Sequence, residues 1–441
     1  MSNARCRLCG EELRHVFADL GVSPLANGYL KPEQLYEAEK FYPLRAYVCE
    51  RDFLVQLEEC EPPSRIFSDY AYFSSYSSTW LRHVERYVDD VIERFALRRD
   101  RPIIEIASND GYLLQFFQRR GFKVLGIEPA ANVAEAARAK GIPTLTRFFG
   151  ADTARDLRAQ GRRAKLLIGN NVLAHVPDLH GFVAGMKILL AADGIFTMEF
   201  HHLLSLVRGH QFDTIYHEHF SYLSLLAVER LFAAHDLALF DVEELPTHGG
   251  SLRVYGKHAQ APSPHRTARI ERLRDKEQAA GLNDLKTYLA FGERVKETKR
   301  RLLRSLIEIK ERGGRIVAYG APAKGNTLLN YCGIGRDFVE YAVDVSPHKQ
   351  GLFLPGTRLA IKDPEAIRET RPDYLLILPW NIKEEVMGQM SWIGEWGGKF
   401  IVPMPEVSVI SADCPQESVC ARASRLSSRG EDHGSRSQGA A

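Results

Sequence analysis

Short apolar runs alternate with amphipathic segments from residue 103 onward, and this alternation constrains the fold more than any other feature. Short apolar runs bounded by turns fit buried strands, whereas apolar residues spaced three and four apart fit helices. The expected strands are 103–106, 123–127, 166–169 and 194–200, and the expected helices between them are 113–120, 132–140 and 179–190. Strands alternating with helices in this way predict a parallel, doubly wound α/β sheet.

A second α/β set follows a long charged region. Residues 265–312 have a helical pattern that is interrupted near Gly281. Beyond it, strands are expected at 316–319, 341–343, 374–378 and 400–403. A further helix is expected at 78–97, before the first set. We therefore predict a central and a C-terminal Rossmann-like domain, with the divisions 1–75 for an N-terminal module, 76–262, 263–411 and a tail from 412 to 441.

The chain's length and composition agree with several domains and exclude some partners. At about 150 residues per domain, 441 residues suggest about three. The net charge of +2 and the absence of a basic cluster argue against nucleic-acid binding. No apolar run approaches the length of a membrane span, and residues 1–13 lack the apolar stretch of a secretory signal. A cytoplasmic protein is expected, with a tail from 412 too polar to order itself.

The loop after the first expected strand is suited to a cofactor. It consists of small and polar residues, Ala107, Ser108, Asn109, Asp110 and Gly111. Small residues let the backbone approach a ligand closely. The acidic Glu128, followed by Pro129, ends the next strand, where a carboxylate can bind both ribose hydroxyls of an adenosine cofactor. Asn170 and Asn171 leave a third strand at the same sheet edge.

Two adenosine cofactors can be distinguished at this loop. NAD carries a pyrophosphate, which usually requires a full G-x-G-x-x-G loop, and the loop lacks that pattern. S-adenosylmethionine (SAM) has no pyrophosphate. The three pieces in this order therefore predict a SAM-dependent methyltransferase.

The N-terminal cysteines indicate a metal site. Cys6 and Cys9 form a C-x2-C knuckle, which commonly binds zinc. Cys49 is followed three residues later by Asp52, whose carboxylate can also bind zinc. His15 and Cys60 are alternative ligands. The seven cysteines of the chain suit this site better than a disulfide framework, and a closed ligand set would make the zinc structural.

Several protic side chains gather in one short stretch, Asp213 to His219. His can act as a base near neutral pH, and Tyr or His can donate to a developing oxyanion. We expect this run to follow a strand. Neighbouring side chains diverge, so only two or three can face one ligand, and His217 is expected to point away.

Ten stretches of the chain, in order, resemble the three-domain sugar-nucleotide C-methyltransferases of deoxysugar biosynthesis. They are CRLCG, YFSSYSSTW, EIASNDGYLL, GIEPAANVA, NNVLAHVPDL, FDTIYHEHFSY, LPTHGGSLRVY, YGAPAKGNTLLNYCGI, SPHKQG and DYLLILPWN. The resemblance implies a zinc module, a SAM domain and a C-terminal domain that helps hold a sugar nucleotide, commonly a thymidine-diphosphate 4-keto deoxysugar. In this family a cysteine usually stands at the position of Asp52.

The resemblance also implies site residues. The family's active-site positions correspond to Tyr76, His175, Tyr216, Glu218 and His219. Our hypothesis makes His219 the base, Glu218 its partner or a proton carrier, and Tyr76 and Tyr216 oxyanion donors.

The substrate side is expected at a second glycine-containing loop. It begins after the strand 316–319 and leads into a helix expected to start near Thr327. The residues expected to contact substrate are Lys324, Asn326, His248 and Lys349. Two alternatives remain from the sequence alone: a methyltransferase acting on oxygen or nitrogen, and a non-catalytic zinc-ribbon adaptor.

Overall fold

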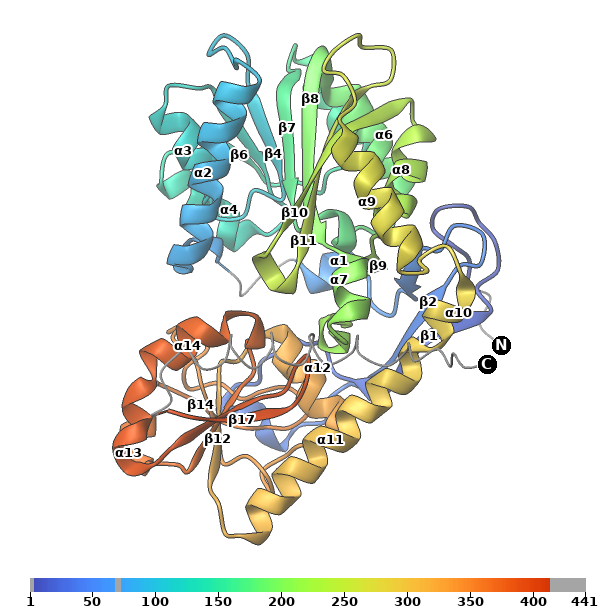
Figure 1. Cartoon of the computed structure of the whole chain (residues 1–441). Coiled ribbons are helices and arrows are strands. Elements are labelled where there is room, and N and C mark those ends of the chain that lie inside the picture. The colour runs from blue at the N-terminus through green and yellow to red at the C-terminus, as the bar shows by residue number, and fades with distance from the viewer. Residues whose placement is uncertain (1–3, 68–72, 413–441) are drawn as a thin grey trace, which may run out of the picture.

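Three sheets organise the computed structural model, which describes residues 4–67 and 73–412 (Figure 1). The N-terminal module and the central domain share the first sheet, in the order β1-β2-β3-β9. The strands are β1 (His15–Ser23), β2 (Tyr42–Val48), β3 (Val55–Leu57) and β9 (Ser221–Tyr222). Since β9 belongs to the central part of the chain and pairs with β3, main-chain hydrogen bonds join the module to the central domain.

The central sheet has the order β10-β11-β8-β7-β4-β5-β6. Its strands are β4 (Ile103–Ile106), β5 (Val124–Ile127), β6 (Thr144–Leu145), β7 (Ala164–Asn170), β8 (Leu190–His201), β10 (Leu237–Leu245) and β11 (Ser251–His258). Its helices are α2 (Ser78–Arg94), α3 (Leu114–Arg119), α4 (Ala131–Ala139), α5 (Ala151–Ala159), α6 (Leu179–Leu189), α7 (Leu203–Arg208) and α8 (Leu225–Ala233). The predicted parallel α/β alternation is confirmed, and β11 adds an antiparallel strand.

The strand order reverses beside β4. The chain proceeds from β4 to β5 and β6 on one side, then crosses to β7 on the other. Open α/β sheets bind ligands at the carboxyl ends of the strands at such a switch point. The predicted cofactor residues follow β4, β5 and β7, so the topology brings them to one crevice.

The C-terminal domain repeats this architecture in the order β14-β13-β12-β15-β16-β17. Its strands are β12 (Ile316–Tyr319), β13 (Ala342–Val343), β14 (Ile361–Lys362), β15 (Tyr374–Ile377), β16 (Lys399–Val402) and β17 (Ser408–Ser411), and its helices are α12 (Ala323–Cys332), α13 (Ala366–Thr370) and α14 (Lys383–Gln389). The charged region before it forms α9 (Ala268–Ala279), α10 (Leu285–Leu289) and the long α11 (Phe291–Glu311). The predicted interruption lies at Gly281, which has a φ of +77°.

Several short helical turns complete the described chain: α1 (Pro63–Ile66), η1 (Pro32–Tyr36), η2 (Ser74–Tyr76), η3 (Leu173–His175), η4 (Phe212–Thr214), η5 (Thr247–Gly249), η6 (Trp380–Ile382) and η7 (Ser391–Trp396). Within the described residues, no helix is both long enough and apolar enough to span a membrane. The predicted tail, apart from residue 412, lies outside the described part of the chain.

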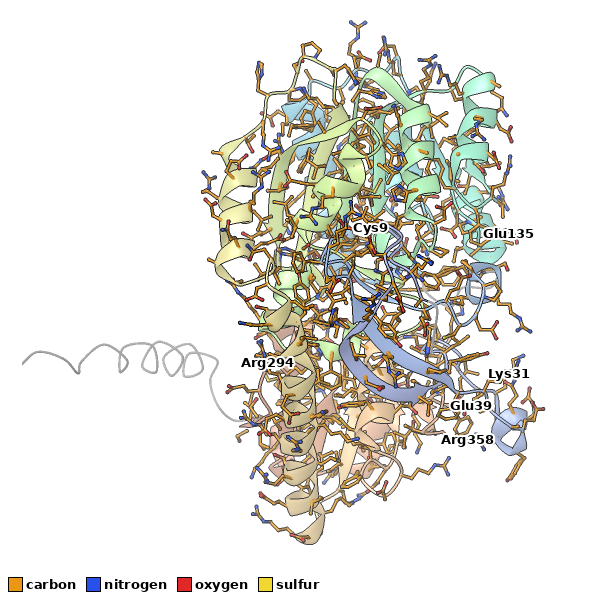
Figure 2. The ribbon with its side chains drawn as sticks, turned by 90° about the vertical axis from the view of Figure 1, so that its right-hand side faces the viewer. Cys9, Lys31, Glu39, Glu135, Arg294 and Arg358 are labelled. Carbon is orange, nitrogen blue, oxygen red and sulfur yellow. The ribbon has the colours of Figure 1, made fainter. Side chains whose placement is uncertain are left out.

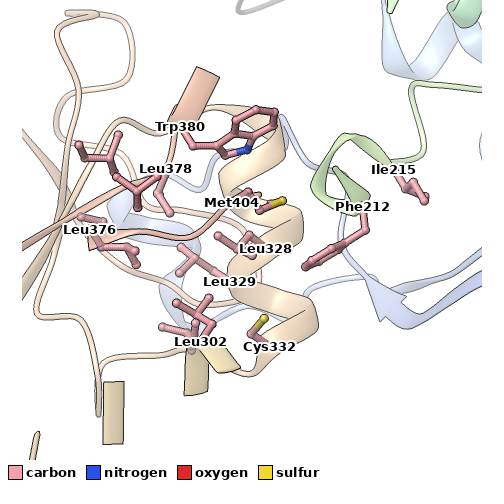
Figure 3. Packing of buried hydrophobic residues seen from close by; sticks show 14 of the residues in the cluster. Phe212, Ile215, Leu302, Leu328, Leu329, Cys332, Leu376, Leu378, Trp380 and Met404 are labelled. Atoms are coloured by element: carbon pink, nitrogen blue, oxygen red, sulfur yellow. The ribbon is translucent and has the colours of Figure 1, made fainter. Parts of the chain in front are cut away.

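Hydrogen bonds and apolar packing join the C-terminal domain to the other two parts of the chain. Glu39 of the N-terminal module accepts a hydrogen bond from Gly356 N at 2.7 Å, next to Arg358 (Figure 2). Phe212 and Ile215 of the central domain join the buried cluster around α12 (Figure 3). The run 213–219 begins within η4, after α7, so the prediction that it follows a strand is wrong. Its position depends on apolar packing against the C-terminal domain.

Candidate active site and metal centre

A carboxylate closes the loop after β4. Glu128 is 5% exposed, and its Oε2 accepts a hydrogen bond from Asn109 N at 3.0 Å. Its Oε1 accepts one from Ala130 N at 2.9 Å. Because a carboxylate oxygen can accept more than one hydrogen bond, the group retains capacity for a ligand's hydroxyls. Burial raises the pKa of Glu128 to about 7.

The backbone of this loop takes unusual conformations. Ala107 has a φ of 54° and Asn109 a φ of 48°, and Asn171 after β7 has a φ of 52°. Non-glycine residues rarely adopt this left-handed region, and such backbone concentrates at ligand sites. At Gly111, with a φ of 75°, a Cβ atom would lie 2.9 Å from Ile142, so the loop has no room for a larger residue there.

A cavity of about 1200 Å³ lies over this sheet edge. Six of the predicted cofactor residues line it: Ala107, Asn109, Glu128, Pro129, Asn170 and Asn171. Ser108, Asp110 and Gly111 do not. Ser108 is fully buried, and Lys140 Nζ lies 2.8 Å from Asp110 Oδ2. These three residues shape the loop from behind rather than contacting the cavity.

Aromatic residues that the sequence prediction missed also line the cofactor side. They are Trp80, Tyr112, Phe148 and Phe149. Phe148 and Phe149 come directly before α5, at the same sheet edge as Glu128. Flat apolar side chains suit an adenine ring, so the cavity fits an adenosine cofactor. The pair of phenylalanines shortly after the segment that forms β6 was the available sequence signal.

His219 is held in one tautomer. Its Nδ1 lies 2.9 Å from Thr214 O, and a carbonyl oxygen can only accept, so Nδ1 carries the proton. Nε2 is then the basic nitrogen, and the Tyr216 hydroxyl donates to it at 2.8 Å. Burial, with His175 beside it, lowers the pKa of His219 well below its usual range. The imidazole is therefore neutral at physiological pH.

The His175 ring packs edge-on against His219, with 4.7 Å between ring centroids. Both rings line the cavity, together with Tyr216. Burial lowers the pKa of His175 to about 4, so it is also neutral. The structure thus brings three of the five predicted catalytic residues together.

The other two predicted catalytic residues, Glu218 and Tyr76, do not line the cavity. Glu218 is bound by Asn27 Nδ2, which donates to its two carboxylate oxygens at 2.7 and 2.8 Å, so the contact expected with His219 is not formed. Burial raises the pKa of Glu218 to about 7. Tyr76 is 60% exposed and its hydroxyl contacts His348 Nε2 at 2.9 Å, which places it outside the cavity lining. His217 points away as expected, toward Pro43 O at 3.1 Å.

The opposite wall comes from the C-terminal domain. Lys324 Nζ donates to Asn381 Oδ1 at 2.6 Å and lies 4.9 Å from the centre of the Trp380 ring. Burial lowers the pKa of Lys324, and the nearby Asp213 opposes that shift. Trp380 Nε1 donates to Asp213 Oδ2 at 2.6 Å, which ties this wall to the central domain.

Three of the four predicted substrate residues line the cavity: Lys324, Lys349 and His248. Asn326 does not, because it is buried at the domain interface and its Nδ2 donates to Ala26 O at 2.6 Å. The helix expected near Thr327 begins at Ala323, so Lys324 lies in its first turn. His201, which the sequence prediction missed, lines the cavity as well.

Four potential metal ligands cluster in the N-terminal module. The sulfurs of Cys6, Cys9 and Cys49 and a carboxylate oxygen of Asp52 all lie within 4.8 Å of one another. Asp52 is 7% exposed, and no hydrogen-bond donor among the described residues satisfies its Oδ2. An unsatisfied buried carboxylate oxygen beside three sulfurs fits a zinc ion, whose structural sites are four-coordinate. The alternative ligands His15 and Cys60 stand outside this cluster.

The three thiols differ in acidity. A hydrogen bond from Cys49 lowers the pKa of Cys6 to about 6, whereas burial raises the pKa of Cys9 to about 11 and the hydrogen bond to Cys6 raises that of Cys49. The sulfurs of Cys9 and Cys49 are 3.6 Å apart. Zinc, when bound, would hold the two knuckles together through these side chains.

A switch-point crevice lined by a buried carboxylate, in this sheet order, fits a SAM-dependent methyltransferase. Three families match the chain by sequence: "Putative zinc binding domain" over residues 6–67, "Methyltransferase domain" over 80–242 and "C-methyltransferase C-terminal domain" over 246–405. C-methyltransferase NovU from Streptomyces niveus is 36% identical over 411 residues, which cover 92% of this chain and 97% of NovU. The chain belongs to this family of three-domain SAM-dependent C-methyltransferases, as its sequence resemblance implied.

Solved structures align with part of the chain. PH0226 protein from Pyrococcus horikoshii OT3 has a TM-score of 0.35 and 15% identity, covering 44% of this chain and 97% of that protein. A SAM-dependent methyltransferase from Clostridium acetobutylicum ATCC 824 has a TM-score of 0.32 and 11% identity, covering 40% and 91%. Family membership as a C-methyltransferase removes the zinc-ribbon adaptor from the alternatives.

Proposed function

We propose that the enzyme methylates the carbon next to the keto group of a nucleoside-diphosphate-linked 4-keto deoxysugar. The observation that carries this proposal is a single cavity in which the cofactor edge, a neutral His219 and the Lys324 wall face one another. Such a substrate has an acidic carbon beside its ketone at one end and a diphosphate at the other. The first requires a base, and the second requires cationic side chains. Thymidine diphosphate is the first nucleotide to test, because the family resemblance favours it.

His219 is the proposed base of this reaction. Its neutral Nε2 can take the proton from the carbon beside the carbonyl, which leaves an enolate. Released from Nε2 when substrate binds, the Tyr216 hydroxyl would donate to the enolate oxygen. SAM, when bound, supplies the electrophilic methyl group. The residues that would hold it are those that follow β4, β5 and β7, with Glu128 on the ribose.

The remaining lining residues favour an anionic substrate. Lys349 adds a second ammonium to that of Lys324, and although burial opposes its charge, Tyr29 and Asp344 raise its pKa overall. Burial lowers the pKa of His201 to about 3 and of His248 to about 4, so both are neutral donors or acceptors. Ammonium groups with imidazoles nearby suit a diphosphate more than a neutral sugar.

Replacing Lys324 by methionine is expected to raise KM for the sugar nucleotide about 10- to 100-fold, because a hydrogen bond to a charged group contributes about 1.5–3 kcal/mol. The affinity for SAM should remain unchanged, since Lys324 lies on the opposite wall. Steady-state kinetics and SAM titration measure the two. The matched control is Lys31→Met, an exposed lysine that does not line the cavity and is labelled in Figure 2. An equal loss for both substrates would indicate a structural defect instead.

The direct test is incubation of the enzyme and SAM with a panel of 4-keto sugar nucleotides, followed by NMR of the products. The proposal expects a new methyl group on a ring carbon beside the original ketone. A methyl on oxygen would contradict the enolate chemistry. Turnover of free sugars as fast as of nucleotide-linked ones would remove the role given to the Lys324 wall.

The divisions 1–75, 76–262 and 263–411 remain our proposal for the three domains.

A further inference from the structure

The metal-binding cluster lies against the central domain, and both of its knuckles are held there. His180 on α6 contacts Leu8 O, between Cys6 and Cys9, at 2.8 Å. Arg230, in the last turn of α8, donates to Arg51 O, between Cys49 and Asp52, at 2.7 Å. Each knuckle is thus anchored through the backbone of a residue next to its ligands.

Arg230 also reaches a ligand directly. Its Nη1 lies 3.3 Å from Asp52 Oδ1, whereas Oδ2 is the buried oxygen that no described donor satisfies. One carboxylate oxygen of Asp52 lies within 4.8 Å of all three sulfurs. Because Oδ1 faces the guanidinium, the buried Oδ2 without a donor is the oxygen available to a metal. Mutation of a residue that orients a metal ligand in this way typically lowers metal affinity by about 10- to 100-fold.

Charge gives Arg230 a second effect. Three thiolates and a carboxylate would carry four negative charges, of which a divalent ion neutralises two. The guanidinium of Arg230 lies beside the remaining negative charge and is partly shielded from solvent. A carboxylate also differs from a thiolate in being able to bind metal through either oxygen or both, so its orientation has to be fixed from outside.

We propose that Arg230 is a positioning residue for the metal: by binding one oxygen of Asp52 it presents the other to the three sulfurs. The metal site is consequently completed by the central domain, and metal retention depends on the docking of the N-terminal module against α8.

The test measures metal, not activity, on the full chain. Zinc affinity is determined by competition with a chromophoric chelator, and the ligand set by the sulfur-to-metal charge-transfer absorption of the Co²⁺-substituted protein. We expect Arg230→Ala to weaken zinc binding about 10- to 100-fold while the charge-transfer intensity stays that of three thiolates. Arg51→Ala is the matched control, because it removes an equal charge from the residue before Asp52 but leaves the contact between Arg230 and Asp52 intact.

A double-mutant cycle with Asp52→Cys decides the mechanism. This variant should show four-thiolate absorption and bind zinc more tightly. Arg230→Ala in its background should change zinc affinity clearly less than in the wild type, because only the effect of the charge of Arg230 remains there. An undiminished effect of Arg230→Ala in that background would overturn the proposal, since the arginine would then act through the Arg51 carbonyl. Equal zinc affinity of Arg230→Ala and Arg51→Ala would overturn it too. Arg230→Gln serves in place of the alanine variant if the latter does not fold.

Discussion

Substitution of His219 by asparagine is expected to lower kcat about 10²- to 10⁴-fold, the usual contribution of a positioned general base. Asparagine keeps a polar group of similar size near Thr214 O but has no basic nitrogen to replace Nε2. Exchange of the substrate's α-hydrogen with solvent deuterium should be lost to the same extent. The exchange is followed by NMR with sugar nucleotide and S-adenosylhomocysteine, so that methyl transfer does not interfere.

His175→Asn provides the sharpest comparison, because that ring lies in the same cavity and in contact with His219. We expect His175→Asn to reduce exchange far less, since His219 Nε2 remains.

Tyr216→Phe should slow methylation, because an oxyanion donor is lost, yet leave His219 neutral and basic. If His219→Asn exchanges deuterium at the wild-type rate while His175→Asn does not, the base is His175 and our assignment is wrong.

Much of the fold follows from local periodicity. The runs at 103–106 and 316–319 became β4 and β12 without change, because a strand buried on both faces is mostly apolar. Glu105 of β4 is the exception, a charged residue type that is fully buried. The pairing of β3 with β9 could not be predicted in this way. It joins segments more than 150 residues apart, and nothing in the composition of either short strand identifies the other.

The candidate site, like the fold, could be predicted only in part. The loop after β4 and Glu128 could be placed, because a parallel sheet brings consecutive strand ends to one edge. Asn326 could not, because only the tertiary structure shows that its amide faces Ala26 rather than the cavity. Glu218 next to His219 in sequence similarly contacts Asn27, from a module almost 200 residues away. Side-chain direction outside regular structure depends on packing that sequence spacing does not encode.

Glu128→Gln is expected to weaken SAM binding about 10- to 100-fold, without a comparable loss of sugar-nucleotide affinity. The carboxylate is fixed by two backbone donors, Asn109 N and Ala130 N, and each hydrogen bond to a charged acceptor contributes about 1.5–3 kcal/mol. A glutamine must turn its NH₂ group toward one of these donors, so it loses an acceptor and disturbs the loop. Calorimetric titration with SAM measures the change, and Glu135→Gln on the exposed face of α4 is the control (Figure 2).

The pH dependence of SAM affinity distinguishes the effect of the charge of Glu128 from the effect of its size and position. Because burial raises its pKa to about 7, the group is partly protonated at neutral pH, and only the carboxylate can accept from both ribose hydroxyls. SAM should therefore bind with proton release below pH 7, and its affinity should fall as the pH decreases and level off above about pH 8. Glu218, whose pKa is also about 7, titrates in the same range but contacts Asn27 instead of the cavity. In Glu128→Gln the dependence should disappear, and its persistence there would assign it to another group and remove Glu128 from the ribose.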